Sequence, residues 1–266
     1  MIAAAFLWAT ALTSGPLRRL GLVGDAVALW SRATRQRAAW APHEEACHAA
    51  IREVVAELPR RRTAIVLGSG LCRDVPVDDL VAGFEQVILV DAVHLLPVRL
   101  RYGRRARMVV ADLAGVTEWM EARTAARSHP LAPWWDDPAI DLVISANVLS
   151  QLPHAVARRQ GRDAAPAARI PADIGRQIVA GHLDDLAGFA GRVCLLSDIG
   201  YREIDLAGSV AAEWDLLEGV ALPPPDRAWD WTVAPRGELD RCIAFVHQAG
   251  AWTDFGRTKT SRGEAT

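Results

Sequence analysis

Residues 63–91, TAIVLGSGLCRDVPVDDLVAGFEQVILVD, decide the fold of this chain. The apolar run Ala64–Leu67 stops at the turn Gly68–Gly70, a segment with helical apolar spacing follows, and a second apolar run, Val87–Val90, ends at Asp91. Runs that are apolar throughout are typical of parallel strands covered on both faces. Glycine has no Cβ, so a turn that contains two glycines can be tight and can approach a ligand closely. The stretch therefore predicts a strand, a glycine turn, a helix and a second strand of a parallel sheet.

Further strand and helix units follow along the chain. We expect strands at 106–110, 140–145 and 192–197, helices at 116–127, 172–190 and 210–218, and a closing pair of strands at 229–233 and 242–248. This order predicts an α/β protein with a doubly wound, mostly parallel, seven-stranded Rossmann-like sheet and helices on both faces. Ligands bind such sheets beyond the carboxyl ends of the strands. The residues expected at those ends are Gly68, Asp91, Asp112, Asn147 and Asp198.

The part of the chain before the first strand is predicted to be helical. Leu20, Val23, Val27 and Trp30 recur at helical spacing, and Pro42 is expected to interrupt the segment before a second helix at 43–58. We therefore divide the chain into an N-terminal helical extension or lid (1–59), a Rossmann-like domain (60–256) and a flexible tail (257–266). The polar stretch 154–171 is longer than a strand–helix connection needs, and we expect it to help cover the acceptor side.

Composition narrows the class of protein. The 266 residues are 51% hydrophobic and 23% charged, as in ordinary globular proteins, and the net charge of −2 argues against a nucleic-acid partner. The four cysteines have no metal-ligand spacing, so we expect buried free thiols, no metal site and a cytoplasmic protein. Residues 1–12 are apolar but too few to cross a bilayer, so we expect a docking helix with at most weak interfacial membrane contact. The oligomeric state stays open.

These motifs together resemble the class I S-adenosylmethionine-dependent methyltransferases over about residues 60–250. The resemblance rests on LGSGLC after the first strand, ILVD at the end of the second, VVADL after the third and DLVISANVLSQLP at the fourth. It implies S-adenosyl-L-methionine as cofactor, with Asp91 on the ribose and Asp112 near the adenine. The cofactor-binding residues it implies are Gly68, Ser69, Gly70, Asp91, Ala92, Asp112, Leu113 and Asn147.

The chain also departs from the family pattern. Val66 stands where the family often has an acid, Cys72 replaces the third glycine of the turn, and the asparagine-proline-proline-aromatic motif of amino-group methylating enzymes is absent. The sequence looks like a bacterial branch of the superfamily, and this resemblance gives no acceptor substrate to infer for the present chain. We therefore expect methyl transfer to a small-molecule acceptor that the sequence does not identify.

The chemistry explains why few catalytic residues are expected. A sulfonium methyl donor is already activated, so displacement depends mainly on orientation, and a base is needed only if the acceptor loses a proton. The catalytic candidates are Asn147, Gln151 and His154, which follow the fourth strand. Asp198 and Tyr201 are weaker candidates for contact with the acceptor.

Each candidate also has a purely structural interpretation. Gly68 and Gly70 could serve only the turn, Asp112 could cap the following helix, and Asn147 could satisfy loop backbone groups. The pairs Trp134–Trp135 and Trp229–Trp231 are better explained by packing than by an aromatic cage.

Two other functions remain open at the level of sequence. An NAD(P)-dependent oxidoreductase is disfavoured because Arg73 stands where G-x-G-x-x-G needs its last glycine. A non-catalytic protein that binds S-adenosylmethionine or a partner is compatible with Val66 and Cys72. The relative affinities for NAD(P) and for S-adenosylmethionine would distinguish the oxidoreductase from a methyltransferase.

Overall fold

β1 (Thr63–Leu67) and β2 (Gln86–Asp91) pair in parallel and are connected through α5 (Val77–Gly83), so residues 63–91 form the predicted strand–helix–strand unit. The structure is a computed structural model that describes residues 2–115, 117, 128–154 and 173–256. The other strands are β3 (Arg107–Val110), β4 (Ile140–Ala146), β5 (Arg192–Ile204), β6 (Val210–Asp215), β7 (Arg227–Ala234) and β8 (Ala244–Trp252). The other helices are α1 (Ile2–Thr10), α2 (Gly15–Arg19), α3 (Leu22–Arg35), α4 (Arg37–Glu57), α6 (Leu96–Tyr102), α9 (Ile174–Ala187), and the short 3₁₀ turns η1 (Ala132–Trp134) and η2 (Leu149–Gln151).

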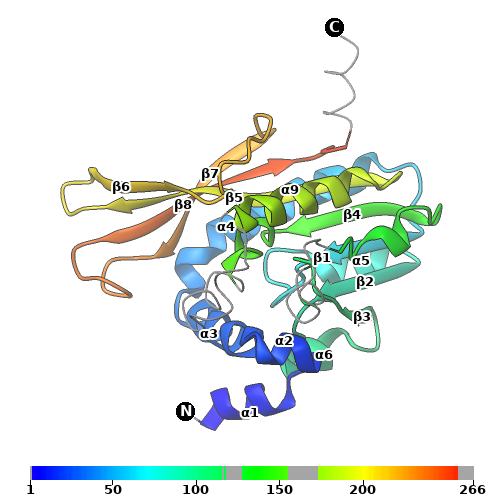
Figure 1. Ribbon diagram of the computed structural model, residues 1–266, viewed down its shortest axis with the longest axis horizontal. Coiled ribbons are helices and arrows are strands. Elements are labelled where there is room, and N and C mark those ends of the chain that lie inside the picture. Colours follow the sequence, from blue (N-terminus) through cyan, green and yellow to red (C-terminus); the bar gives the residue numbers. More distant parts are fainter. Residues whose placement is uncertain (1, 116, 118–127, 155–172, 257–266) are drawn as a thin grey trace, which may run out of the picture.

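Within the described residues one mixed sheet organises the molecule (Figure 1). Its strand order is β3-β2-β1-β4-β5-β8-β7, and β6 pairs with β5 outside this path. The pairs among β1 to β5 in this path are parallel, whereas β8 is antiparallel to both β5 and β7. The direction of winding reverses between β1 and β4. This is the point at which a doubly wound sheet opens a crevice for a ligand.

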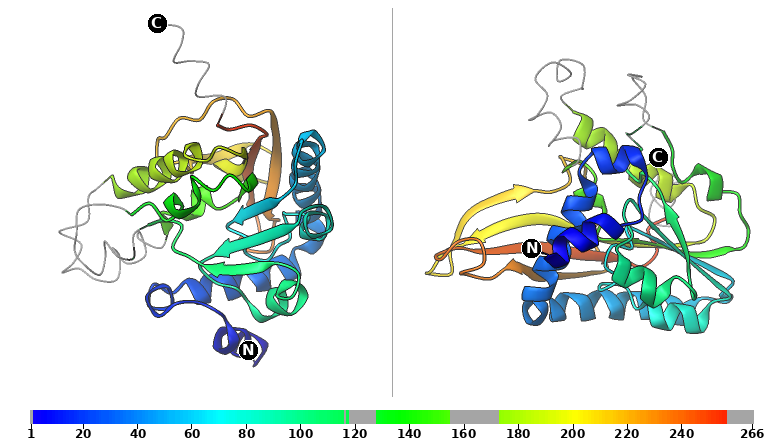
Figure 2. Two further views of the ribbon diagram at one scale, coloured as in Figure 1. Left: turned by 90° about the vertical axis from the view of Figure 1, so that its right-hand side faces the viewer. Right: turned by 90° about the horizontal axis from the view of Figure 1, so that it is seen from below.

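Helices cover both faces of the sheet, as the sequence predicts (Figure 2). Side chains alternate along each strand: Ile65 of β1 packs in one hydrophobic cluster with α9, and Val66 packs in another with α4 and α5. Both residues are fully buried. The continuous apolar run in β1 is therefore explained by a sheet that is dry on both sides.

The N-terminal helices pack beside the segment that follows β2. Val23 and Val27 of α3 join Val93 and Leu95 in a separate hydrophobic cluster, and Thr13 Oγ1 donates a hydrogen bond to the Ala92 carbonyl at 2.8 Å. Figure 1 shows α1, α2 and α3 along one side of the molecule, next to α6. Helix α4 behaves differently, because its apolar face is part of the layer that covers the sheet. The division at residue 59 stays a prediction.

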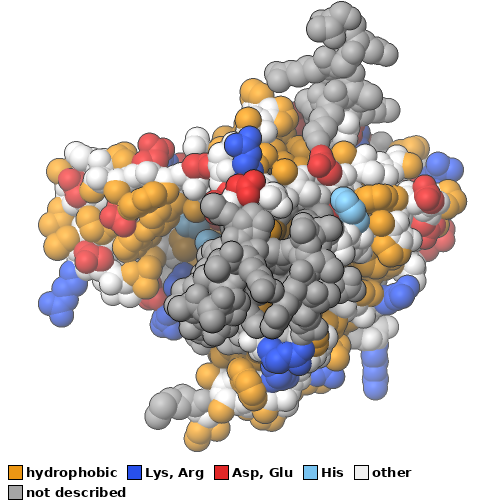
Figure 3. All heavy atoms as spheres, viewed as in Figure 1, with side chains coloured by type: hydrophobic (Ala, Val, Ile, Leu, Met, Phe, Trp, Pro, Cys, Tyr) orange, Lys and Arg blue, Asp and Glu red, His pale blue; other side chains and the backbone are white. Residues whose placement is uncertain are grey.

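The predicted mostly parallel, doubly wound sheet is confirmed. It has one strand more than the seven expected, because residues 210–215 form β6 and not the expected helix. β5 was expected to end near Ser197, but it continues to Ile204, beyond its last parallel pair with β4 at Leu196. That extension presents unpaired backbone groups, and β6 satisfies them in an antiparallel pairing. Figure 3 shows hydrophobic side chains on the surface of this antiparallel extension, where Val210 and Trp214 of β6 are exposed. Backbone pairing decides the structure here and overrides the helical spacing.

The predicted interruption at Pro42 is also wrong. α4 is continuous from Arg37 to Glu57, and the break between α3 and α4 lies at Gln36, whose φ of −97° and ψ of 21° are outside the helical region. Pro42 is exposed and removes one backbone donor from the helix. Burial of the apolar face of α4 against the sheet offsets this loss. Apart from Thr117 and His154, the expected helix at 116–127 and the stretch 154–171 lie outside the described residues, as does the tail.

Candidate functional site

A pocket of about 480 Å³ opens at the switch point of the sheet, within the volume range of small-ligand sites. Its floor is formed by the segments that follow β1, β2, β3 and β4, and residues of α3 and α4 form the opposite wall. The pocket brings together most of the site residues predicted from sequence: Gly68, Gly70, Asp91, Ala92, Asp112, Leu113, Asn147, Gln151 and His154. Ser69 is not among the lining residues, and its side chain is fully buried.

The two glycines of the turn after β1 have different surroundings. Both have positive φ, +71° at Gly68 and +45° at Gly70, which L side chains rarely adopt. A Cβ on Gly68 would lie 2.4 Å from Cβ of Val148, in the segment after β4, so this glycine is required by packing. A Cβ on Gly70 would meet nothing closer than the Gly68 carbonyl oxygen at 3.7 Å. Gly70 lines the pocket, and packing does not exclude a Cβ there as it does at Gly68.

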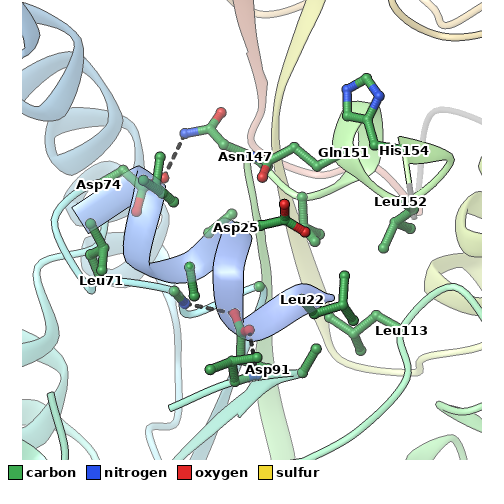
Figure 4. Close-up of a pocket in the computed structure, with 18 of the residues that line it drawn as sticks. Leu22, Asp25, Leu71, Asp74, Asp91, Leu113, Asn147, Gln151, Leu152 and His154 are labelled. Atoms are coloured by element: carbon green, nitrogen blue, oxygen red, sulfur yellow. Dashed lines mark hydrogen bonds between the residues drawn. The ribbon is translucent and has the colours of Figure 1, made fainter. Parts of the chain in front are cut away.

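Asp91 ties the turn after β1 to the segment after β2. Its Oδ2 accepts a hydrogen bond from Gly70 N–H at 2.7 Å, and its Oδ1 accepts one from Val93 N–H at 3.0 Å (Figure 4). Burial raises the pKa of Asp91 above its usual range, although the two backbone donors act in the opposite direction. Each carboxylate oxygen has a second lone pair, so Asp91 can hold the turn and still accept from a ligand hydroxyl.

Asp112 caps the segment that follows it, as the structural interpretation of this residue predicts. Its Oδ1 accepts from Ala114 N–H at 3.1 Å, and its Oδ2 accepts from the backbone N–H and the hydroxyl of Thr117 at 2.6 Å and 2.5 Å. These are the bonds of an N-cap carboxylate. Asp112 also lines the pocket, so the cap does not remove it from a ligand's reach.

Asn147 connects the end of β4 to the loop before α5. It has a φ of +48°, which asparagine tolerates better than most residues, and its side-chain amide donates to Asp74 Oδ2 at 2.8 Å. Gln151 Nε2 donates to the Asn147 carbonyl at 2.6 Å and so fixes the turn. Burial raises the pKa of Asp74 to about 6, although the hydrogen bond from Asn147 lowers it. Asp74 lines the pocket and was missed from sequence, because an acid after a glycine turn carries no motif of its own.

His43 of α4 reaches the same place from the opposite wall. Trp229 Nε1 donates to His43 Nδ1 at 3.0 Å, which leaves the ring hydrogen on Nε2, 3.6 Å from the Cys47 sulfur. The Asn147 amide nitrogen lies 3.2 Å from the same Nε2. Burial lowers the pKa of His43 to about 4, so its imidazole is neutral at pH 7. The sequence offered little support for this histidine, because its position depends on how α4 packs on β7.

Aromatic rings continue this wall. The ring of Trp231 stacks on His43 with centroids 4.0 Å apart, and Trp40 meets Trp231 edge-on at 5.1 Å. Trp40 Nε1 donates to the Val233 carbonyl at 2.9 Å, which holds α4 against β7. Trp40, His43 and Trp231 all line the pocket. The prediction that the Trp229–Trp231 pair serves packing is therefore incomplete, because Trp231 also forms pocket surface.

The remaining candidates lie at the rim or outside the pocket. His154 is exposed and reaches only the rim. Asp198 lies within β5, not at its end, and accepts from Ser150 Oγ at 2.9 Å and from His247 Nδ1 at 2.6 Å. Burial raises the pKa of Asp198, but the bond and charge of His247 outweigh it and leave that pKa below the usual range. Neither Asp198 nor Tyr201 is among the lining residues, so the structure does not place them at the pocket.

Fold and site together define a doubly wound α/β protein with a small-ligand pocket at the carboxyl ends of its parallel strands. No family model matches the sequence, and no curated protein matches it. Among solved structures, the chain is similar to the Burkholderia thailandensis 1,6-didemethyltoxoflavin-N1-methyltransferase, whose crystal structure contains 1,6-didemethyltoxoflavin and S-adenosylhomocysteine. The two are 15% identical, with a TM-score of 0.38, over 91% of this chain and 92% of the other. In the described part of the chain, no helix is long and apolar enough to cross a membrane.

Proposed function

We propose that this protein transfers a methyl group from S-adenosyl-L-methionine to a small-molecule acceptor. One observation carries the proposal: the Asp91 carboxylate holds Gly70 N–H at 2.7 Å beside a pocket at the switch point. A nucleoside cofactor needs a backbone turn without a side chain and an acid that accepts from its ribose hydroxyls. Gly70 and Asp91 supply both, and a Cβ at Gly70 would meet the Gly68 carbonyl oxygen at 3.7 Å and Asp91 Oδ2 at 4.0 Å.

The antiparallel end of the sheet favours methyl transfer over hydride transfer. The dinucleotide-binding sheet has the order 3-2-1-4-5-6, whereas here β8 lies antiparallel between β5 and β7. A terminal strand pair of this kind is what the resemblance to class I methyltransferases implies. The proposal therefore ranks S-adenosylmethionine above nicotinamide dinucleotides as the cofactor.

The chain's own residues would bind the cofactor, orient the acceptor and accept its proton. The cofactor supplies an electrophilic methyl group, and the segment after β4 faces the place where an acceptor must approach it. An acceptor that has an N–H or O–H group must also lose its proton. Asp74 lines the pocket, and burial raises its pKa to about 6. At neutral pH its carboxylate is therefore a better placed base than the exposed His154.

Calorimetry with S-adenosylmethionine, S-adenosylhomocysteine and NAD tests the cofactor assignment. We expect micromolar binding of the first two and at least tenfold weaker binding of NAD. Asp91→Ala should weaken S-adenosylhomocysteine binding by about 1.5–3 kcal/mol, the cost of hydrogen bonds to a charged group. Asp230→Ala is the matched control, because Asp230 is an exposed acid that pairs with Arg202 on the antiparallel extension. Tighter binding of NAD than of either sulfur cofactor would refute the proposal.

A further inference from the structure

Helix α1 is apolar but exposes most of its surface. Its nine residues contain no charged side chain, and only Leu7 among them is buried. A helix that is apolar all round is normally covered by protein or by lipid. We define the N-terminal apolar face by its large exposed side chains, which are 89%, 55%, 48% and 40% exposed in the order Ile2, Phe6, Trp8 and Leu12.

Contacts with the segment after β2 hold this face in a fixed position. Leu12 and His94 exchange two backbone hydrogen bonds, at 3.0 Å and 2.9 Å. Arg99 Nη1 of α6 donates to the Thr10 carbonyl at 2.8 Å, at the last turn of α1. Leu7 packs on the hydrophobic cluster that contains residues of α3. The helix is therefore docked by one side and presents the same residues outward.

The segments that meet at this place are basic. Residues 1–24 and 92–111 together contain seven arginines and no acidic residue, although the whole chain has a net charge of −2. Two of these arginines pair with Asp78 of α5. Arg18 and Arg99, in contrast, donate to backbone carbonyls, which hold a guanidinium without neutralising it. Positive charge therefore borders the apolar face.

Arg18 and Trp8 join this charge directly to the apolar face. The Arg18 guanidinium carbon lies 4.7 Å from the centroid of the Trp8 ring, and its Nη1 donates to the Trp8 carbonyl at 3.2 Å. Figure 3 shows hydrophobic side chains at the lower end of the molecule, where Figure 1 places α1, with basic side chains beside them. Tryptophan and arginine each combine an apolar body with a polar end, as side chains at the boundary between lipid tails and headgroups do.

The size of the face favours lipid over a protein partner. A stable protein interface uses roughly 20–30 residues on each side, whereas this face offers four large apolar side chains. A lipid surface needs no complementary shape, and apolar side chains bordered by arginine bind it when its headgroups are anionic.

We propose that the N-terminal apolar face docks on the surface of an anionic membrane. Phe6 and Trp8 enter the headgroup region, and Arg18 and Arg99 lie against the negative charges of the lipids. α1 lies in the plane of the surface, because its nine residues are too few to cross the hydrocarbon core. This inference goes beyond the proposed function and does not depend on it.

Flotation of the unmodified protein with vesicles tests the proposal. One set of vesicles contains only phosphatidylcholine, and the other contains equal parts of phosphatidylcholine and phosphatidylserine. We expect about tenfold tighter binding to the mixed vesicles and a loss of this difference at high salt, because salt screens charges near the surface. Equal binding to both sets at low salt, or no binding to either, would overturn the proposal.

Matched apolar variants test the assignment of α1. Phe6→Ser should weaken binding to the mixed vesicles about tenfold, because an aromatic side chain no longer leaves water. Leu239→Ser is the control, since Leu239 is 57% exposed against 55% for Phe6 but lies between β7 and β8. Circular dichroism checks that both variants are folded. Unchanged binding of Phe6→Ser would overturn the assignment.

Two variants of Arg18 test the role of charge. Arg18→Gln should weaken binding to the mixed vesicles about fivefold and leave binding to pure phosphatidylcholine unchanged. Arg18→Lys keeps the charge and should bind the mixed vesicles as the unmodified protein does. Equal loss in both variants would overturn the charge assignment, because Arg18 would then act only through its hold on α1. A dimer that forms without lipid and is lost in Phe6→Ser would assign the face to a second copy of the chain and overturn the lipid assignment.

Discussion

Alanine at Gly68 and alanine at Gly70 should have different consequences, although the residues are two positions apart. Both variants place a side chain at positive φ, which costs about 1–2 kcal/mol for an L residue. Gly68→Ala also forces its Cβ to within 2.4 Å of Cβ of Val148. Overpacking at this partly buried contact adds about 1–3 kcal/mol. We therefore expect Gly68→Ala to lower the free energy of unfolding by about 2–5 kcal/mol, and Gly70→Ala by about 1–2 kcal/mol.

Urea denaturation followed by circular dichroism measures both changes, and calorimetry with S-adenosylhomocysteine measures binding. Val148→Gly removes the atom that the new Cβ meets, so the double variant Gly68→Ala/Val148→Gly should be less destabilised than the sum of the two single variants. Gly70→Val, by contrast, should stay folded and lose cofactor binding, because its side chain would enter the pocket. Equal destabilisation by Gly68→Ala and Gly70→Ala, or additivity in the double variant, would refute the packing argument.

Two further changes test the acid response and the long helix. As the pH falls from 7.5 to 4.5, His43 takes up a proton in the unfolded state before it does so in the folded state, and this lowers stability. Asp74 takes up its proton first in the folded state, and this raises stability. Asp74→Asn removes the second contribution. The free energy of unfolding, measured by urea denaturation, should therefore fall by about 2 kcal/mol more between pH 7.5 and pH 4.5 than it does in the unmodified protein. An unchanged difference would contradict the raised pKa of Asp74. Pro42→Ala restores a backbone donor at an exposed position within α4 and should raise stability by about 1–2 kcal/mol in the same assay; a loss of stability would show that α4 needs the proline's local geometry.

The central strands were predictable because their residues are apolar for one local reason. A strand buried on both faces must be apolar at every position, so β1, β2 and β4 can be identified from short runs alone. The glycine turn and Asp91 follow from the same stretch, since the turn after one strand meets the end of its neighbour. β6 could not be predicted in this way. Its six residues form a hairpin with the extension of β5. That extension is paired on its other edge with β8, which lies much later in the chain, and no local pattern in β6 indicates this pairing.

The two sides of the pocket also differ in how far a local sequence pattern predicts them. Gly70, Asp91 and Asn147 sit at strand ends, where topology alone brings them together. Trp40 and His43 come from α4, and Trp231 comes from β7, almost two hundred residues later. No local pattern states that this helix packs on that strand. The sequence therefore predicts the strand-end side of the pocket but leaves the opposite wall to be read from the structure.

The cysteines of this chain differ sharply in their accessibility to thiol reagents. Cys242 is exposed, contrary to the expectation that all four are buried, whereas Cys47, Cys72 and Cys194 are buried. Burial raises the pKa of Cys194 to about 12 and holds the thiols of Cys47 and Cys72 well above their ordinary range, so little reactive thiolate forms at neutral pH. After Cys242 is replaced by serine, any alkylation records an opening of the folded molecule. Cys72 follows the glycine turn and Cys47 lies on α4, so the sites of labelling would show which wall of the pocket opens and how far a bound ligand slows it.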